Sequence, residues 1–196
     1  MEKKDLKPAG VFKYFEEICQ VPRPSKKEEK IIAYLKAFGA KHNLETKVDE
    51  AGNVLIKKPA TPGKENLQTV VLQSHIDMVC EKNNDVQHDF LTDPIETEID
   101  GEWLKAKGTT LGADNGIGVA TELAILADDS IEHGPLECLF TVDEETGLTG
   151  AFALQEGFMS GDILLNLDSE DEGEIFIGCA GGIDSVAEFT YKEVEV

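Results

Sequence analysis

Residues 69–77 read TVVLQSHID. The first four are apolar or β-branched, a composition typical of a strand buried in the middle of a sheet. The segment then ends on His75 and Asp77, which lie two positions apart, and alternate side chains of an extended chain share one side. These nine residues therefore predict a central strand whose end carries an imidazole and a carboxylate on the same side.

Two further apolar runs end in the same way. Residues 136–142 lead into Asp143-Glu144-Glu145, and residues 163–167 lead into Asp168. A glycine-rich loop at 108–118 contains Asp114 and opens a helix, and a short helix is expected near 150–154. The resulting order of strand, helix, strand, helix, strand predicts an α/β sheet with helices on both faces. Ligands of such sheets bind beyond the carboxyl ends of the strands.

The flanking segments predict a helical and β framework around these strands. Apolar spacing predicts a helix from Pro8 to Val21, where prolines stop it. Ser25 and Glu28 form a capping-box pattern at the start of a second helix that runs to about His42. The remaining expected elements are strands at 45–49 and 54–57 and a hairpin formed by 95–99 and 102–105.

Composition limits the classes of partner. The 196 residues are 41% hydrophobic, enough for one globular domain, and carry a formal net charge of −21 from 39 acidic and 18 basic residues. This acidity argues against binding nucleic acid or an anionic membrane. The four cysteines form no CxxC pair, no apolar stretch approaches the ~20 residues of a membrane span, and the charged start lacks a secretory signal. We expect a cytoplasmic protein.

The polar residues at the strand ends are of types that bind metal. One imidazole with several carboxylates suits zinc, manganese or cobalt, and a carboxylate such as Asp114 can bridge two ions. Asp77 can accept the far ring N–H of a ligating His75. Of the adjacent Glu144 and Glu145, one can bind metal while the other accepts a proton from water.

Each of these features also has an ordinary explanation. A lone histidine at a strand end is more often structural, a Glu-Glu pair in so acidic a chain is usually solvated, and Asp114-Asn115-Gly116 can be a simple turn. The repetition of potential ligands after three apolar strands strengthens the metal-hydrolase interpretation, but the pattern alone leaves it and the ordinary explanations both open. A glycosidase with two carboxylates is disfavoured, because it leaves His75 and Asp77 without a role.

Four ordered motifs resemble those of the co-catalytic metallopeptidases, the group that includes aminoacylase, carnosinase and bacterial tripeptidase. They are LQSHIDMV at 72–79, GTTLGADNGIG at 108–118, DEETG at 143–147 and NLDSE at 166–170. Within this group, residues 74–83, 108–120 and 175–182 are most similar to the aminoacyl-histidine dipeptidases, which are also called Xaa-His dipeptidases. The resemblance extends over essentially the whole chain.

The resemblance implies a zinc-exopeptidase-like (phosphorylase/hydrolase-like) three-layer α/β sandwich with a mixed sheet. It implies two divalent ions, zinc first with cobalt or manganese as alternatives. His75, Asp114 and Asp168 would hold one ion, and Asp114 and Glu145 the other.

The resemblance also assigns the catalytic roles. Asp77 would orient His75. Glu144 would be the general base that moves a proton from a water bridging the ions to the leaving amine. A cis peptide is expected after the bridging aspartate, at Asp114-Asn115.

The sequence differs from this family in how much of the family's full chain it contains. The family's second metal site takes a histidine from far along the chain, and His42, His88 and His133 do not fit that role. The family also inserts a lid domain that forms a homodimer. We therefore expect residues 1–182 to be the first part of an incomplete catalytic domain, and 183–196 to begin the lid or a crossing strand. We also expect the chain to be a fragment, inactive by itself.

Three functions are consistent with these features. The first is hydrolysis of small Xaa-His dipeptides such as carnosine, with neither nucleic acid nor membrane as a partner. The second is a related two-metal tripeptidase, aminoacylase or desuccinylase. The third, for this chain alone, is a non-catalytic acidic domain that binds a single cation.

Overall fold

The computed structural model describes residues 2–169, 171, 173–179, 181–183 and 185–192. Its helical elements are η1 (Lys3–Asp5), α1 (Ala9–Cys19), α2 (Glu29–Lys41), α3 (Ala113–Ala127) and α4 (Thr149–Ala153). Its strands are β1 (Glu45–Val48), β2 (Val54–Lys58), β3 (Val70–His75), β4 (Thr97–Asp100), β5 (Trp103–Ala106), β6 (Leu136–Thr141) and β7 (Ile163–Asn166). Every expected helix and strand is present, with ends shifted by a few residues at most.

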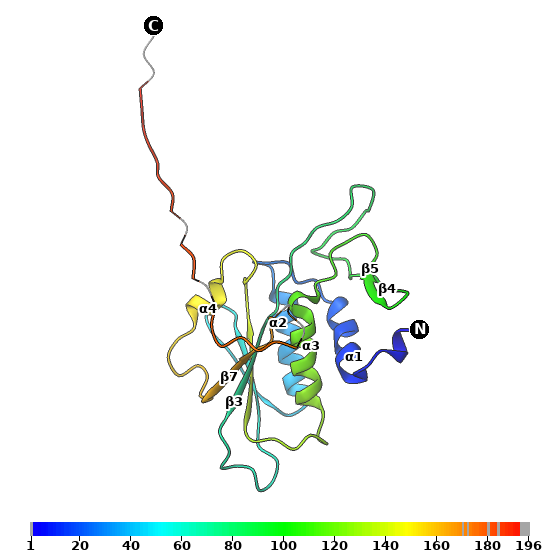
Figure 1. Cartoon of the computed structure of the whole chain (residues 1–196), viewed down its shortest axis with the longest axis vertical. Helices are drawn as coiled ribbons and strands as arrows, with labels where there is room; N and C mark the ends of the chain where they lie inside the picture. The colour runs from blue at the N-terminus through cyan, green and yellow to red at the C-terminus, as the bar shows by residue number, and fades with distance from the viewer. Residues whose placement is uncertain (1, 170, 172, 180, 184, 193–196) are drawn as a thin grey trace.

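Five strands form a mixed sheet in the order β1-β2-β6-β3-β7. β3 pairs in parallel with β6 on one side and with β7 on the other, whereas β1 and β2 are antiparallel to their neighbours. The expected mixed α/β fold is therefore confirmed. β4 and β5 form a separate hairpin beside α1 (Figure 1).

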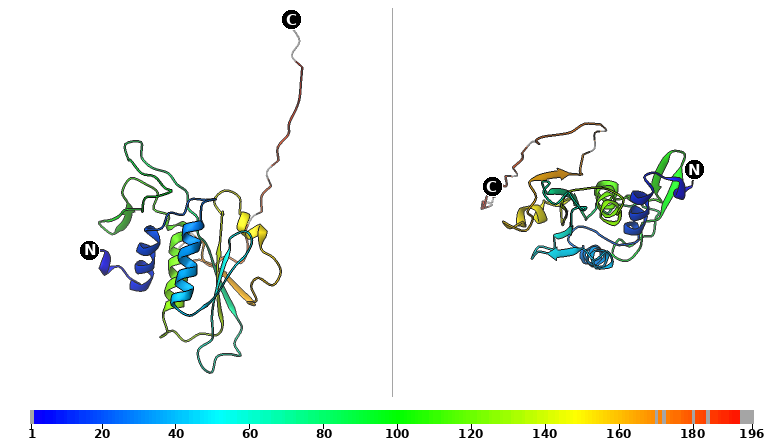
Figure 2. Two further views of the ribbon diagram at one scale, coloured as in Figure 1. Left: turned by 180° about the vertical axis from the view of Figure 1, so that it is seen from behind. Right: turned by 90° about the horizontal axis from the view of Figure 1, so that it is seen from below.

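The two faces of the sheet are covered very unequally. α1, α2 and α3 lie together on one face (Figures 1 and 2), where their apolar side chains form the main core with β2, β3 and β6. The other face has a small cluster of Leu55, Val71 and Leu139, covered by side chains from residues 154–159 that follow α4. The sandwich therefore has one thick helical layer and one thin layer.

Two local expectations were wrong. Residues 163–167 were expected to form a buried strand, but Ile163, Leu164 and Leu165 of β7 are each at least 39% exposed. Among the described residues β7 pairs only with β3, so one of its edges is unpaired. Ser25 and Glu28 do not form a capping box either: α2 begins at Glu29 without a side-chain cap, and both residues bond to distant segments instead.

Helix α3 carries one carboxylic acid into the core. Glu122 is fully buried against β3 and β6, and neither of its carboxyl oxygens has a hydrogen-bond partner among the described residues. Burial raises the pKa of Glu122 well above its ordinary value, and the nearby Ser74 hydroxyl and Cys138 thiol oppose the shift only in part. Glu122 is therefore a neutral acid in the folded protein, since burying the charged form costs far more.

The sign of the pH dependence follows from this neutral state. Above pH ~4.5 the unfolded chain loses the Glu122 proton while the folded chain keeps it, so stability falls by about 1.4 kcal/mol per pH unit until the folded pKa is reached. We expect Glu122→Gln to remove this contribution. When the free energy of unfolding is measured with urea from pH 5 to 8, the value for Glu122→Gln should exceed that of wild type by an amount that grows with pH. Glu102→Gln, at the exposed hairpin turn, is the control. Parallel curves for Glu122→Gln and wild type would contradict the prediction.

The described part of the chain after Asp168 contains neither helix nor strand, and residues 185–192 run away from the body (Figure 1). The proposed boundary between residues 182 and 183 stays a prediction. None of the helices in the described ranges has both the length and the apolar character needed to span a bilayer. The four cysteines are free thiols, with Cys19 and Cys138 buried.

Candidate metal centre

The sheet topology brings three strand ends to one edge. β3 and β6 run in parallel with His75 opposite Thr141, so the 143–145 segment begins just beyond His75. β7 is parallel to β3 on its other side with Asn166 opposite Gln73, and Asp168 follows two residues later. The start of α3 supplies Asp114 from above the same edge. Residues expected from the sequence to act together therefore meet in space.

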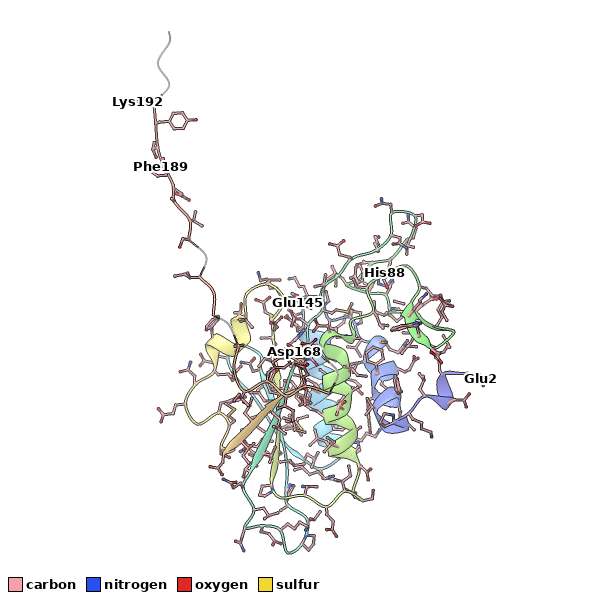
Figure 3. All side chains as sticks on the ribbon, in the orientation of Figure 1. Glu2, His88, Glu145, Asp168, Phe189 and Lys192 are labelled. Carbon is pink, nitrogen blue, oxygen red and sulfur yellow. The ribbon has the colours of Figure 1, made fainter. Side chains whose placement is uncertain are left out.

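The imidazole of His75 is the centre of this group. Its Nε2 atom lies 2.9 Å from Asp114 Oδ1, 3.8 Å from Asp168 Oδ2 and 4.0 Å from Glu144 Oε2. Ligand atoms of His75, Asp114 and Asp168 all lie within 4.8 Å of one another. Figure 3 shows Glu145 and Asp168 near the end of α3 at which Asp114 lies. Glu145 does not belong to this three-residue group.

The donor atoms fit a divalent transition metal ion. Zinc bonds of ~2.0–2.2 Å at tetrahedral angles place ligand atoms ~3.4 Å apart, and the separations of 2.9 and 3.8 Å from Nε2 lie on either side of that value. One nitrogen and several carboxylate oxygens suit zinc, manganese or cobalt. His75 and Asp114 with Asp168 would hold one ion. The expected set is therefore assembled for one ion.

Negative charge gathers here, and among the described residues His75 is the basic side chain that pairs with it. Among the described residues, no lysine or arginine forms an ion pair with Asp114, Glu144, Glu145 or Asp168. Burial raises the pKa of Glu144, Glu145 and Asp168, and neighbouring carboxylates raise them further. Burial lowers the pKa of His75, but hydrogen bonds to Asp77 and Asp114 outweigh this and raise it to about 9. A cation bound among these groups would relieve the repulsion.

Asp77 orients the histidine and holds the turn that carries the two glutamates. It is fully buried, and its Oδ1 atom lies 3.2 Å from His75 Nδ1, which leaves Nε2 directed toward the acids. It also accepts hydrogen bonds from the Ser25 hydroxyl and from the backbone amides of Glu144 and Glu145. Burial raises the pKa of Asp77, but these bonds outweigh it and lower the pKa to about 2. Asp77 is therefore a buried carboxylate that stays ionised.

Arg23 joins the strand end to the glycine-rich loop. Its buried guanidinium donates to the carbonyls of Ile76 and Asp77 and, at 2.5 Å, to that of Gly112. Gly112 has a φ of +68°, and a Cβ atom there would lie 2.5 Å from the guanidinium. Only glycine allows this close approach. Because Gly112 lies two residues before Asp114, Arg23 fixes Asp114 relative to His75.

The sequence predicted site residues that the structure brings together, but it did not predict part of what supports them. The Asp114-Asn115 peptide is cis, as expected. Arg23 and Ser25 were not identified as site residues, although two prolines and a serine before a helix mark the segment as an ordered turn. All four histidines are described, and the other three lie elsewhere. The His42 ring packs at a tilt on Phe38, the His88 ring packs edge-on against Phe90, and His133 Nδ1 lies 2.6 Å from the carbonyl oxygen of Gly134.

Comparison with known proteins gives consistent matches. Residues 71–191 match the model of peptidase family M20/M25/M40. The chain is 54% identical over 183 residues to the cytosol non-specific dipeptidase of Escherichia coli K12, covering 93% of this chain and 38% of that protein. It superposes on the crystal structure of aminoacylhistidine dipeptidase from Vibrio alginolyticus with a TM-score of 0.88 and 56% identity, covering 91% of this chain and 36% of that one.

A more distant structure has the same fold. Aminopeptidase PepT from Bacillus cereus matches with a TM-score of 0.70 and 27% identity, over 83% of this chain and 43% of that protein. The chain thus spans well under half the length of each of these relatives.

Proposed function

The chain belongs to peptidase family M20/M25/M40, and from that membership we propose that it forms the metal-binding part of a two-metal dipeptidase. Its substrates would be small dipeptides, Xaa-His dipeptides such as carnosine among them. The observation that carries the proposal is the convergence of His75, Asp114 and Asp168 within 4.8 Å of one another, with no lysine or arginine paired to the two acids among the described residues. Names of similar proteins support dipeptides as the substrate class.

Each residue has a defined role in this proposal. His75, Asp114 and Asp168 hold the first ion, and Asp114 and Glu145 contribute to the second. Bound divalent ions would polarise the scissile carbonyl and lower the pKa of water. Glu144 takes a proton from the attacking water, whose oxygen bonds to the carbonyl carbon, and delivers that proton to the amine nitrogen as the peptide bond breaks.

The raised pKa of Glu144 suits this role. Burial raises it first, with smaller contributions from Asp168 and Glu145, while His75 lowers it. A carboxylate whose pKa lies closer to neutrality is a stronger base than an ordinary surface glutamate. Its Oε2 atom lies 4.0 Å from His75 Nε2, so it faces the space in which the ion and water would sit.

The residues proposed for the second ion, Asp114 and Glu145, include no histidine. We propose that residues 1–196 bind one divalent ion tightly and a second only weakly, because Asp114 and Glu145 alone are a poor ligand set for zinc. This favours the third candidate function, a single-cation acidic domain, for the chain in isolation. Homodimer formation through a lid domain belongs to the longer polypeptide in this proposal, and the compartment is the cytoplasm.

A chimera tests the activity. Residues 1–191 are joined to the remaining part of the E. coli relative, which is 54% identical over the shared region. We expect the chimera to hydrolyse dipeptides, to lose this activity in chelator and to regain it with zinc, whereas the chain alone is inactive. A panel of Xaa-His, other dipeptides, tripeptides and acylated amino acids identifies the preferred substrate class.

The matched control is the same chimera with Glu144→Gln, which keeps the size of the side chain but cannot accept the proton. We expect its kcat to fall by about 10²–10⁴-fold. Undiminished hydrolysis by verified metal-free chimera would refute the proposal. Two equally tight zinc sites in the isolated chain, measured by calorimetry, would refute the single-site assignment.

A further inference from the structure

Three consecutive backbone amides next to the metal centre are each held by a buried carboxyl group. Asp143 N donates to Glu28 Oε1 at 3.0 Å, Glu144 N to Asp77 Oδ1 at 3.1 Å and Glu145 N to Asp77 Oδ2 at 3.2 Å. Glu144, the proposed general base, and Glu145, the proposed ligand of the second ion, thus lie on one turn. Every backbone amide of this turn, from 143 to 145, is hydrogen-bonded to a carboxyl group. Asp77 accepts two of these three hydrogen bonds, and Glu28 accepts the third.

Glu28 comes from a different part of the chain. It lies just before α2, is only 6% exposed and is 115 residues from Asp143 in sequence. The same Oε1 atom also accepts a hydrogen bond from Lys26 N at 3.0 Å. Burial raises the pKa of Glu28, while these backbone amides lower it. The bond to Asp143 requires an oxygen acceptor at that distance and does not require a negative charge.

The turn needs such a tie because its first residue is in an uncommon conformation. Asp143 has a φ of +50°, in the left-handed region that non-glycine residues seldom adopt. Its carboxylate accepts hydrogen bonds from the hydroxyls of Thr146 and Thr149, both at 2.5 Å. Glu28 therefore holds the backbone of Asp143 while the two threonines hold its side chain.

We propose that Glu28 is a positioning residue that anchors the 143–145 turn, so that Glu144 faces His75 and Glu145 faces Asp114. This inference rests on the proposed function, because the importance of the turn follows from the roles of its two glutamates. Misplacing a reacting group by ~1 Å can cost about 10²-fold in rate. In this proposal Glu28 acts through the backbone of Asp143 and is not one of the residues that hold the two ions.

Two conservative variants distinguish the effect of the length of the Glu28 side chain from the effect of its charge. Glu28→Gln keeps an oxygen at the same distance and removes the charge, whereas Glu28→Asp keeps the charge and shortens the side chain by one methylene. Glu29→Ala is the matched control, because it removes an exposed acid from the same end of α2. If the bond to Asp143 matters, Glu28→Gln should behave as wild type and Glu28→Asp should not.

The first measurement is amide hydrogen exchange, which needs no metal. We expect the Asp143 amide to exchange about 10-fold faster or more in Glu28→Asp, because the shorter side chain loses this hydrogen bond and local opening becomes easier. Exchange in Glu28→Gln should stay within about three-fold of wild type, and amides of β6 should be unaffected in all three variants. Faster exchange throughout β6 would show a general structural role and overturn the proposal.

The second measurement uses Co²⁺ bound at the tight site as a paramagnetic probe. We expect the paramagnetic shifts of the Glu144 and Glu145 amide protons to change in Glu28→Asp and to be restored in Glu28→Gln. Unchanged shifts in Glu28→Asp, or an equal disturbance by Glu28→Gln, would overturn the proposal. Failure of wild-type protein to bind Co²⁺ would instead count against the proposed function, and the exchange measurement would still decide the role of Glu28.

Discussion

Replacing His75 by alanine is expected to lower the zinc affinity of the tight site by more than about 100-fold. His75 supplies the nitrogen donor of the three-residue group, and its Nε2 atom lies within 4.0 Å of oxygens from Asp114, Glu144 and Asp168. Loss of a residue that merely supports a ligand typically costs about 10–100-fold. Loss of the ligand itself should exceed that range. Isothermal titration calorimetry at pH 7 measures the change.

The matched control for His75→Ala is His88→Ala. His88 lies on a loop where its ring packs edge-on against Phe90, away from Glu145 and Asp168 (Figure 3). Its replacement should leave the zinc affinity within about two-fold of wild type, because it removes a histidine without removing a donor from the site. Equal losses in both variants would show that zinc binds non-specifically to histidines, and retained affinity in His75→Ala would exclude the proposed centre.

Replacing Asp77 by asparagine should have the second-largest effect, lowering zinc affinity by about 10–100-fold. Asp77 accepts four hydrogen bonds, whereas asparagine offers one acceptor oxygen and an NH₂ group that must face donors. At least one of the amides of Glu144 and Glu145, the Ser25 hydroxyl or the His75 ring then loses its partner. We also expect unfolding free energy to fall by about 1–3 kcal/mol per unpaired donor.

Zinc titration and urea unfolding together check the Asp77→Asn prediction. Asp85→Asn, at an exposed position of the loop after β3, makes the same chemical change outside the site and should alter neither measurement. The variant should remain folded at pH 7 by circular dichroism, because asparagine preserves the shape of the buried side chain. An affinity within about three-fold of wild type would show that His75 does not depend on Asp77 for its orientation.

The candidate metal ligands could be proposed from the sequence because each follows an apolar strand or opens a helix. The apolar run at 136–141 predicts a buried strand, and polar residues directly after a strand lie at its carboxyl end. His75 and Asp77 share one side because alternate residues of an extended chain do so. The locations of Asp114, Glu144, Glu145 and Asp168 relative to those strands followed from similar local patterns.

The support around those ligands could not be identified in the same way. Arg23, Ser25 and Glu28 lie in a segment whose spacing predicted a helix cap, yet they bond to Gly112, Asp77 and Asp143, at least 50 residues away. A side chain pairs with whichever donor or acceptor is nearest in space, and local spacing carries no information about distant neighbours. Burial of β7 was misjudged for the same reason, since a strand's exposure depends on what pairs with it.

The sequence by itself thus determined the order of strands and helices and the set of ionisable groups at the strand ends, because both follow from the period of a single element. The tertiary structure decided the rest. Parallel pairing of β3 with β6 and β7 brings Glu144 Oε2 and Asp168 Oδ2 within 4.0 Å of His75 Nε2. Glu28, just before α2, and Asp77 then hold the 143–145 turn. The backbone amides of this turn need hydrogen-bond partners, and only folding of the chain brings those partners near.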